Sequence, residues 1–328
     1  MIEVLLGSPM LTIQDTGRTG WRHLGVPRCG MMDELALRQG NLLLGNDEHA
    51  AGLEITSAPV LLKFLQDSAI VLMGADMQAS ILDQTHKNTR EQRLLTGFVY
   101  QLSAGECLRL NAAKTPGQRA MLMVSGGCDV PLVMGSRSTD LMSGFGGLHG
   151  QALRAGDKIP LGQPSHKCIH LKSGVRQHSW NHQLRVLTGP DFTQFDQRSR
   201  QALFEKSWMV TAQSNRMGLR LQGDRLQLNQ SDNKPSSRGL SIGVLPGLIQ
   251  VPPDGQPILL AADAQTTGGY PAIASIISTD LWQLAYMTNG TRVRFAEVSL
   301  AEAHGLARHQ QQQMDRLRDA LTLRRAPA

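Results

Sequence analysis

The chain has 328 residues, which is long for a single hydrophobic core and predicts two domains or one large lobed domain. Hydrophobic residues make up 41%, and no stretch approaches the roughly 18 unbroken apolar residues of a membrane helix, so we expect no membrane association. The net charge of +6 is modest, aromatic residues amount to 4%, and none lies among the C-terminal arginines. Base stacking therefore lacks its usual side chains, which argues against a nucleic-acid partner.

The N-terminal sequence and the cysteines both bear on the cellular compartment. Residues 1–7 contain no basic leader or long apolar core, so we expect no export signal. The cysteines at positions 29, 107, 128 and 168 are widely spaced and form no Cys-x-x-Cys pair, which is typical of reduced thiols. The sequence therefore predicts a cytoplasmic protein.

In the first half of the chain, the hydrophobic pattern predicts one helix and two buried strands. Residues from Asp33 to Leu44 place leucines and an alanine on one side, which is the pattern of an amphipathic helix. The short apolar runs Ala69–Met73 and Ala120–Val124 are each closed by a polar or glycine residue, as buried strands are. We assign residues 1–175 to an N-terminal β lobe.

A polar, histidine-rich segment from Ser165 to Gln183 separates two glycine-rich strand regions, and we place a lobe boundary there. Within it, His166, Cys168 and His170 alternate, so they would share one face of a strand, as zinc ligands do. No fourth ligand follows at a recognisable spacing. We therefore expect no metal site.

The second half of the chain again reads mainly as strands. Short apolar or alternating segments predict strands, and two further segments predict helices. The strands are expected at Leu184–Leu187, Leu219–Leu221, Leu226–Leu228, Ile258–Leu260 and Val293–Phe295, and the helices at Phe192–Phe204 and from Ser299 onward. Ser299 and Glu302 have the spacing of a capping box. With 33 glycines and 15 prolines as punctuation, we predict a mainly β fold with a β lobe at 184–300 and a C-terminal helix at 299–325.

Two polar turns in the first lobe are candidates for binding. In the turn Gln14–Gly20, glycines bracket Arg18, whose paired donors suit a carboxylate or phosphate, while Asp15 accepts a proton or orients the arginine. In Gly135–Thr139, Ser136 and Ser138 flank another arginine and follow two glycines, and such converging amides and hydroxyls suit anions. A purely structural Asp–Arg turn is equally consistent with the first pattern.

Known phosphate-binding loops are absent from the sequence. Gly144-Phe145-Gly146-Gly147 does not fit the dinucleotide fingerprint, because His149 stands where the third glycine is required. The Gly-x-x-x-x-Gly-Lys-Ser/Thr motif does not occur. The chain thus has no recognisable phosphate loop for ATP.

The second lobe has two further polar segments. Asn215, Arg216 and Arg220 lie in and after a turn, and both arginines would share one face if the strand began early enough, although salt bridges at a barrel rim are equally consistent. A cluster follows the apolar run at 258–262. It consists of Asp263, Gln265, Thr266, Thr267, Gly268, Gly269 and Tyr270. Adjacent glycines leave the backbone free to adopt positive φ and expose its N–H groups to an oxyanion or amide, but an ordinary strand-end turn also fits.

These segments and others in the same order resemble the KipA family, also described as allophanate hydrolase subunit 2 or the biotin-dependent carboxyltransferase A/B domain. The resemblance covers nearly the whole chain to about residue 300. It is carried by Gln14–Gly20, Gly25–Asp33, Asn41–Asn46, Leu53–Ile55, Gly126–Pro131, Gly135–Thr139, Ser214–Leu221, Gln250–Pro252 and Asp263–Pro271. So many ordered motifs are not expected by accident.

Within this family the chain is most similar to the 5-oxoprolinase branch. The resemblance implies two cyclophilin-like β-barrel lobes, a KipI-like B subunit and a separate A subunit as partners. It also implies ATP-dependent opening of 5-oxo-L-proline to L-glutamate, with ATP used by the complex. No Met-Lys-Met acceptor sequence occurs, so we expect no covalent biotin on this chain.

The implied reaction assigns expected roles to the polar residues. Since a lactam is a poor electrophile, the site must hold the substrate anion and stabilise developing charge. We expect Arg18 or Arg216 to clamp an anion, and Asp15 or Asp263 to orient these groups or act as base. The expected substrate-binding residues are Asn215, Arg220, Gln265, Thr266, Thr267, Gly268, Gly269, Tyr270, Ser136 and Ser138.

Two other functions stay open at this point. One is carboxyl transfer between biotin on another protein and urea or a related amide. The other is a regulatory binding protein that antagonises a KipI-like kinase inhibitor. One position departs from the family pattern, because Ser237-Arg238-Gly239 carries an arginine where an acidic residue is common, which weakens any role for that loop.

Overall fold

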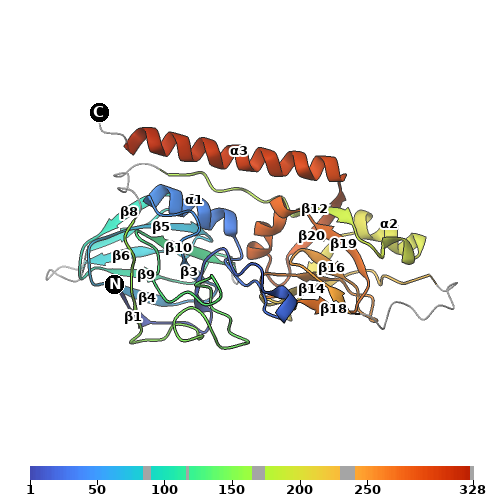
Figure 1. Ribbon diagram of the computed structural model, residues 1–328, viewed down its shortest axis with the longest axis horizontal. Helices are drawn as coiled ribbons and strands as arrows, with labels where there is room; N and C mark the ends of the chain where they lie inside the picture. The colour runs from blue at the N-terminus through green and yellow to red at the C-terminus, as the bar shows by residue number, and fades with distance from the viewer. Residues whose placement is uncertain (84–89, 116–117, 165–173, 230–240, 326–328) are drawn as a thin grey trace. The chain divides into compact units, whose positions relative to one another are not determined.

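The computed structural model describes residues 1–83, 90–115, 118–164, 174–229 and 241–325 (Figure 1). His166, Cys168 and His170, at which no metal site was expected, lie outside these ranges, as does Ser237-Arg238-Gly239. Over the described ranges, no three His, Cys, Asp or Glu residues gather as metal ligands would. No helix in this part of the chain has the length and hydropathy needed to cross a bilayer.

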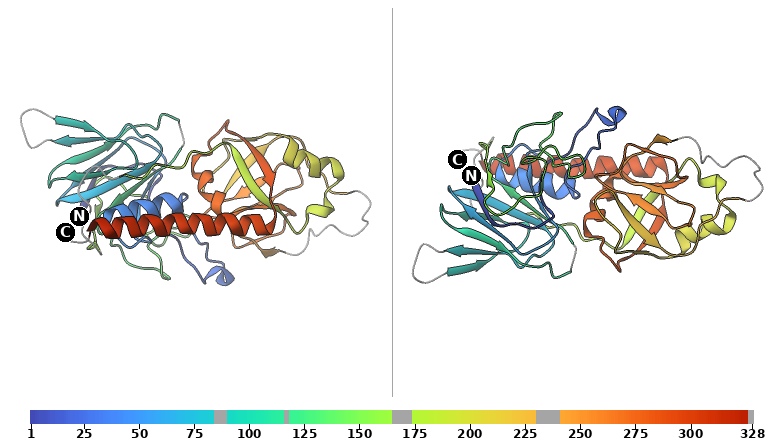
Figure 2. Two further views of the ribbon diagram at one scale, coloured as in Figure 1. Left: turned by 90° about the horizontal axis from the view of Figure 1, so that it is seen from above. Right: turned by 90° about the horizontal axis from the view of Figure 1, so that it is seen from below.

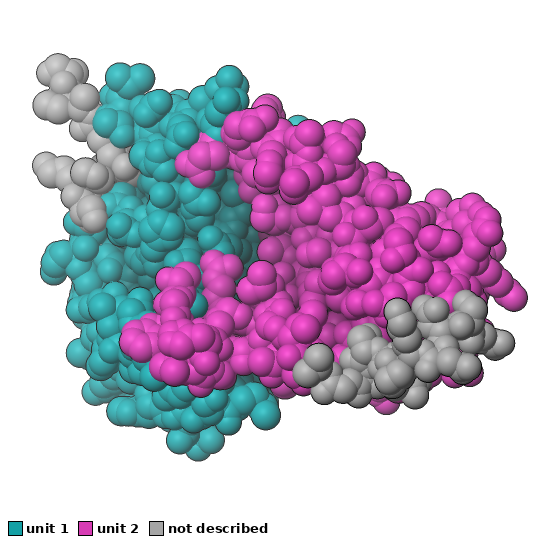
Figure 3. All heavy atoms as spheres, turned by 45° about the vertical axis from the view of Figure 1, so that its right-hand side comes forward, with its two compact units in different colours: residues 1–18, 29–178, 312–328 teal, residues 19–28, 179–311 magenta. Residues whose placement is uncertain are grey.

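The chain folds as two compact units, which are coloured separately in Figure 3. Unit 1 contains residues 1–18, 29–178 and 312–328, and unit 2 contains residues 19–28 and 179–311. The domain ranges predicted from the sequence did not assign residues 19–28 to the second unit. They also did not divide the C-terminal helix between the two units. The segment 19–28 begins immediately after Arg18, so the glycine-rich turn Gln14–Gly20 supplies residues to both units.

Unit 1 is built from two antiparallel sheets (Figure 2). The strand orders are β11-β1-β4-β9-β6-β7 and β2-β3-β10-β5-β8. The first sheet contains β1 (Ile2–Leu6), β4 (Val60–Phe64), β6 (Ser80–Asp83), β7 (Arg90–Arg93), β9 (Cys107–Leu110) and β11 (Lys158–Ile159). The second contains β2 (Leu11–Gln14), β3 (Gly52–Ile55), β5 (Ser68–Gly74), β8 (Val99–Leu102) and β10 (Ala120–Val124). The strands predicted at 69–73 and 120–124 are confirmed as β5 and β10.

The core of unit 1 explains why β5 and β10 read as continuous apolar runs. Alternate residues such as Leu72 and Leu122 enter a cluster shared by both sheets, while the opposite face of these strands lies against helix α1 (Glu34–Leu44). A Cβ atom at Gly40 of α1 would overlap the Met123 side chain, so the helix backbone lies directly on the strand. With both faces covered, no position in these strands favours a polar residue.

The predicted helix at 33–44 is confirmed, and its ends follow the sequence. The Asp33 carboxylate caps α1 by accepting a hydrogen bond of 2.8 Å from the Ala36 N–H. Gly45 ends the helix in the left-handed region, with φ of 77°.

Unit 2 contains a closed seven-stranded barrel in the order β12-β19-β16-β17-β14-β13-β20. Its strands are β12 (Gln183–Thr188), β13 (Trp208–Val210), β14 (Gly218–Gln222), β16 (Leu248–Gln250), β17 (Ile258–Leu260), β19 (Ala272–Ile276) and β20 (Arg292–Glu297). Strands β12 and β20 pair in parallel and close the barrel, and the remaining pairs are antiparallel. A separate two-stranded sheet joins β15 (Ile242–Gly243) to β18 (Thr267–Gly268). The mainly β class is thereby confirmed.

The other predicted helices include one that is confirmed and one that is interrupted. Helix α3 (Leu300–Arg325) begins with the expected capping box, because Glu302 Oε2 accepts from the Ser299 N–H at 2.7 Å and Ser299 Oγ accepts from the Glu302 N–H at 3.2 Å. The helix predicted over 192–204 is instead a short 3-10 turn, η2 (Phe192–Gln194), followed by α2 (Gln197–Glu205). Asp196 interrupts the segment by capping α2 through the Ser199 N–H at 2.7 Å. The remaining 3-10 turns are η1 (Arg22–Leu24) and η3 (Ser278–Tyr286).

One predicted strand is wrong. Leu226–Leu228 alternates as a strand does, yet Leu228 makes only an isolated bridge to Phe195. The segment is held in place by turn contacts, including the Leu226 N–H to the Gly255 carbonyl at 3.0 Å. The alternation of apolar and polar residues there reflects which side chains pack beside the barrel. The backbone of this segment is not a strand of the barrel sheet.

Candidate functional site

Asp15, directly after β2, organises a buried polar cluster in unit 1. Its Oδ1 accepts hydrogen bonds from the Gly17 N–H at 2.8 Å, Ser136 Oγ at 2.6 Å and Ser138 Oγ at 2.5 Å, and its Oδ2 accepts from the Arg137 N–H at 2.6 Å. The residue is 7% exposed. With four donors already directed at it, this carboxylate is suited to orienting the 136–138 turn and poorly suited to removing a proton from a ligand.

Arg18 lies next to this cluster and is 1% exposed. Its Nη2 donates to the Ser138 carbonyl, and its guanidinium lies over the Phe145 ring, 4.6 Å from the ring centroid. Its Nε and Nη1 are buried without a hydrogen-bond partner among the described residues. Ring stacking and one carbonyl do not neutralise a cation, so this guanidinium has the features of an anion-binding group.

A polar pocket of about 420 Å³ opens beside the Asp15 turn in unit 1. Four motifs that are distant in the sequence contribute to its lining. They are Asp15–Gly17, Asn46–Asp47, Gly126–Asp129 and the Gly135 and Arg137 positions. The sequence identified each motif, and the fold brings them together.

The backbone amides of this pocket are engaged within the protein. The Gly126 N–H donates to Asn46 Oδ1 at 2.7 Å, and the Gly127 N–H donates to the Val124 carbonyl at 2.8 Å. A Cβ atom at Gly126, where φ is +86°, would overlap the Gly162 carbonyl. These glycines therefore allow two chain segments to approach closely. The amides and hydroxyls of 135–139 that were expected to converge on an anion converge on the Asp15 carboxylate of the protein itself.

Cys128 also lines the pocket of unit 1. Burial raises the pKa of its thiol to about 12. A thiol with this pKa stays protonated at neutral pH, and the protonated thiol is a poor nucleophile.

In unit 2, Arg216 and Asp263 form a bidentate ion pair. The Nε–Oδ2 and Nη2–Oδ1 distances are both 2.8 Å, and the two side chains are 4% and 11% exposed. The Asp263 N–H also donates to the Arg216 carbonyl at 2.9 Å. Asp263 thus fixes the guanidinium plane and compensates its charge.

Arg220 does not share the environment of Arg216. Strand β14 begins at Gly218, so Arg216 precedes it and is buried, whereas Arg220 is exposed. The predicted common face is wrong for this reason. Asn215 shapes the preceding turn, because its Oδ1 accepts from the Met217 N–H at 2.8 Å and the Gly218 N–H at 3.3 Å.

The polar loop 263–270 is held by backbone contacts. The Thr266 carbonyl accepts from the Val244 N–H at 3.0 Å, and Thr267 and Gly268 form β18. Gln265, Thr267 and Gly269 are exposed. After Asp263 the loop is therefore fixed by the β15–β18 sheet, and the side chains of Gln265, Thr267 and Tyr270 face solvent.

The glycine pair in this loop has a different role from the one expected. Neither Gly268 nor Gly269 has a positive φ. A Cβ atom at Gly268 would lie 2.7 Å from Gln250 Nε2, which donates to the Tyr270 carbonyl at 3.1 Å. Gly268 thus makes room for the Gln250 amide, and the expected positive-φ oxyanion loop is wrong.

Arg22 was not identified from the sequence. Its Nη2 donates to the Val244 carbonyl and, at 2.9 Å, to the Gln265 carbonyl. Burial, and then the nearby charge of Arg28, lowers the pKa of Arg22. Its place four residues after Arg18, directly after the turn Gln14–Gly20, was the available signal.

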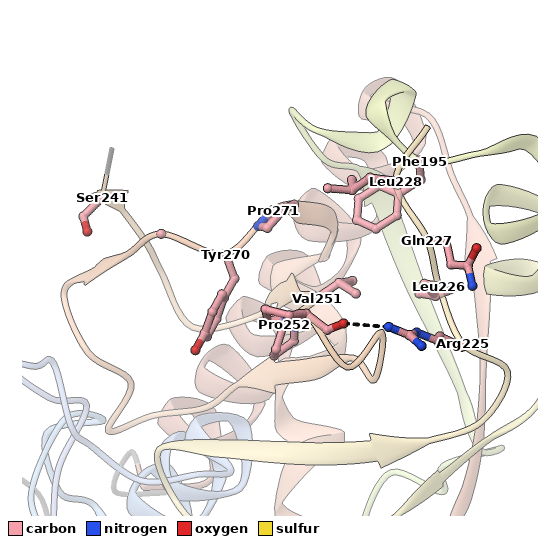
Figure 4. A pocket seen from close by; sticks show the side chains of 12 residues that line it. Phe195, Arg225, Leu226, Gln227, Leu228, Ser241, Val251, Pro252, Tyr270 and Pro271 are labelled. Atoms are coloured by element: carbon pink, nitrogen blue, oxygen red, sulfur yellow. Dashed lines mark hydrogen bonds between the residues drawn. The ribbon is translucent and has the colours of Figure 1, made fainter. Parts of the chain in front are cut away.

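A second pocket, of about 520 Å³, lies beside Tyr270 in unit 2 (Figure 4). Gly269, Tyr270 and Pro271 form one part of its lining. Arg225 forms another, and its Nη2 donates to the Pro253 carbonyl at 3.1 Å. Sequence patterns did not point to Arg225, because it lies in a turn without a recognisable motif.

The candidate residues divide between the units. Asp15, Arg18, Ser136 and Ser138 belong to unit 1, and Asn215, Arg220 and the Arg216–Asp263 pair belong to unit 2, together with Gln265 to Tyr270. The fold joins Asp15 and Arg18 to the 136–138 turn and Arg216 to Asp263, whereas Arg220 and Tyr270 are exposed and take no part in that ion pair. A single pocket that combines Arg18, Arg216 and Asp263 stays a prediction.

Comparisons with a family model, with known sequences and with solved structures each found similar proteins. Residues 24–297 match the family model described as carboxyltransferase domain, subdomain A and B. The chain is 41% identical over 317 residues to the C subunit of 5-oxoprolinase from Escherichia coli, covering 97% of each protein, and 36% identical to the C subunit of 5-oxoprolinase from Haemophilus influenzae, covering 97% and 98%. The crystal structure of the urea amidolyase of K. lactis superimposes with a TM-score of 0.84 at 27% identity, covering 96% of this chain and 20% of the larger one.

Proposed function

The chain belongs to the carboxyltransferase domain family, subdomains A and B, and on that premise we propose that it is a subunit of a 5-oxoprolinase. The enzyme would hydrolyse 5-oxo-L-proline to L-glutamate in a reaction coupled to ATP hydrolysis. The observation that carries this proposal is the 41% identity to the C subunit of 5-oxoprolinase from E. coli over 97% of both proteins. The agreement in length matters, because no large segment of that relative lacks a counterpart here.

The proposed complex contains a KipI-like B subunit and an A subunit, and acts in the cytoplasm. The sequence has no Gly-x-x-x-x-Gly-Lys-Ser/Thr motif, so we assign ATP binding to another subunit or to an unfamiliar site. Without a Met-Lys-Met sequence, no biotin is attached to this chain.

The chemistry of lactam hydrolysis gives the two groups of residues their proposed roles. Water must add to the ring carbonyl while the C–N bond breaks, and the departing nitrogen gains a proton. Arg18 is suited to binding an anionic group that forms during the reaction, such as a phosphorylated intermediate, because no carboxylate among the described residues neutralises it. Asp15 is suited to positioning the turn beside Arg18.

The residues of unit 2 have complementary roles in this proposal. Asp263 orients Arg216, and the loop that follows supplies Gln265, Thr266 and Thr267 as polar contacts. Asn215 lies in the turn before β14, and Arg220 lies within β14. Because the Asp263 carboxylate compensates the charge of Arg216, this arginine would offer a ligand oriented N–H donors and little net positive charge.

Reconstitution tests the proposal. Purified chain alone, chain with a B-type partner, and all three subunits would be assayed for ATP hydrolysis that depends on 5-oxoproline and for L-glutamate release. We expect activity in the complete mixture only. A complete mixture that forms no glutamate would refute the assignment.

The likeness to urea amidolyase favours a second candidate, carboxyl transfer to urea or a related amide. It requires biotin on a carrier protein, which streptavidin would detect. Substituting urea for 5-oxoproline in the same mixture decides between the two, because only a carboxyltransferase would turn over ATP in response to urea.

A further inference from the structure

The pocket beside Tyr270 combines an apolar wall with a small set of polar groups. Its volume of about 520 Å³ lies in the range typical of small-molecule sites. Apolar lining residues are Phe195, Leu226, Leu228, Val251, Pro252 and Pro271. In Figure 4, Arg225 and Gln227 lie on one side of the pocket, and Tyr270 and Ser241 on the other.

Five chain segments line this pocket, and hydrogen bonds join three of them, residues 225–228, 251–255 and 269–271. The Val251 N–H donates to the Pro271 carbonyl at 2.9 Å, and the Leu226 N–H donates to the Gly255 carbonyl at 3.0 Å. Gly255, with φ of +77°, allows close approach, because a Cβ atom there would overlap the Arg225 side chain. The walls are thus set before a ligand arrives, which lowers the entropy lost on binding.

Arg225 is the one charged residue among the described residues that line the pocket. Its Nη2 is held by the Pro253 carbonyl at 3.1 Å, and no carboxylate within the described ranges forms an ion pair with it. The guanidinium therefore retains donors and a positive charge for a ligand. A carboxylate is the group that these donors match best.

We propose that this pocket is the subsite that binds 5-oxoproline, an inference that rests on the proposed function. Arg225 binds the carboxylate, the methylene face of the ring packs on Val251 and Pro252, and the Tyr270 hydroxyl binds the ring amide. Among the described residues of the lining, the single positive charge of Arg225 matches a monoanion.

The same lining disfavours the product. L-Glutamate carries an ammonium group in addition to its carboxylates, and the described part of the lining offers no acidic side chain to pair with it. Ring opening thus creates a charge that the pocket does not accommodate, which favours release of the product. We expect L-glutamate to inhibit only weakly at this subsite.

The test uses the reconstituted complex with Arg225→Gln and Tyr270→Phe. We expect the KM for 5-oxoproline to rise about 10- to 100-fold in the first variant and about 3- to 10-fold in the second, because each loses a polar contact with the ligand. The KM for ATP should not change. Arg198→Gln, at an exposed arginine of α2 outside the pocket, is the matched control and should behave as wild type.

A neutral competitor separates ligand contact from a general effect on folding. 2-Pyrrolidinone has the ring amide without the carboxylate, so its inhibition constant should be the same for wild type and Arg225→Gln. If Arg225→Gln does not fold, Arg225→Lys replaces it, with an expected smaller rise in KM because charge remains without the planar fork.

The outcomes distinguish this proposal from the proposed function. A wild-type complex that does not act on 5-oxoproline refutes the function and the subsite together. An active wild-type complex whose KM for 5-oxoproline is unchanged by both substitutions refutes the subsite alone. An equal loss of 2-pyrrolidinone inhibition in Arg225→Gln would also overturn the assignment of Arg225 to the carboxylate.

Discussion

Arg18 in unit 1 and Arg216 in unit 2 are both buried, yet their surroundings differ. Arg216 meets Asp263 through two hydrogen bonds of 2.8 Å, so its charge is compensated within the protein. Arg18 meets a carbonyl and the face of Phe145, and no carboxylate among the described residues pairs with it. The carboxylate next to Arg18 in the sequence, Asp15, is engaged by two hydroxyls and two amides.

This difference separates a structural charge from one available to a ligand. Removing one member of a buried pair leaves its partner unsolvated, so Arg216 and Asp263 must be retained together. A buried cation without a counter-ion destabilises the free protein, and binding of an anion offsets that cost. Three substitutions test the contrast, and a labelling experiment at Cys128 tests burial in the same unit as Arg18.

Asp263→Ala should have the largest effect, because it leaves the Arg216 guanidinium buried without its carboxylate. We expect a loss of about 3 to 5 kcal/mol in the free energy of unfolding, measured by urea denaturation. The double variant Arg216→Met/Asp263→Leu should recover most of this stability. Equal destabilisation in the single and double variants would show that the ion pair is not the cause.

Arg18→Met should lower turnover of the reconstituted complex by about 100-fold, comparable to the loss of one oriented anion-binding donor. The stability of the free protein should stay the same or rise, because the variant removes a buried cation and no described carboxylate loses its partner. Arg216→Met is the matched comparison and should lose stability as well as activity. A strongly destabilised Arg18→Met protein would contradict the proposed difference between the two arginines.

Asp15→Asn should destabilise the protein by about 1 to 3 kcal/mol. The new side-chain NH₂ group would point at N–H or O–H groups that now donate to the Asp15 carboxylate, and a donor that faces a donor leaves both without a hydrogen bond. Thermal unfolding measures this effect. Asp129→Asn, at an exposed carboxylate 2.7 Å from Arg137, is the control and should change stability by no more than about 1 kcal/mol. Similar losses in both variants would argue against a special role for the Asp15 cluster.

Cys128 should give the smallest effect. With a thiol pKa of about 12, the thiolate fraction at pH 8 is about one in ten thousand, so iodoacetamide should not modify Cys128 in the folded protein. Because folding raises the pKa of the Cys128 thiol, we expect iodoacetamide to modify it only as the pH approaches 12 or when the protein unfolds. Peptide mass spectrometry after labelling at pH 8 measures this, and rapid modification of native Cys128 would contradict the assigned burial.

The sequence was most informative where one local interaction sets the structure. Helix α1 begins at the Asp33 cap and α3 begins at the Ser299–Glu302 box, as their spacing predicted. Strands β5 and β10 were recognisable because burial on both faces leaves an unbroken apolar run. Leu226–Leu228 misled because alternation records which side chains are buried and not whether the backbone joins a sheet.

The sequence by itself determined the class of fold, the family motifs and the polar segments that carry the candidate site. Tertiary structure alone decided that Asp15 accepts four hydrogen bonds, that Asp263 pairs with Arg216, and that Gly268 makes room for Gln250. It also decided the place of Arg22 and Arg225, whose partners lie far away or in motif-free turns. The reason is physical, because the availability of a charge depends on the groups that folding brings to it, and those groups come from segments that the sequence does not order in space.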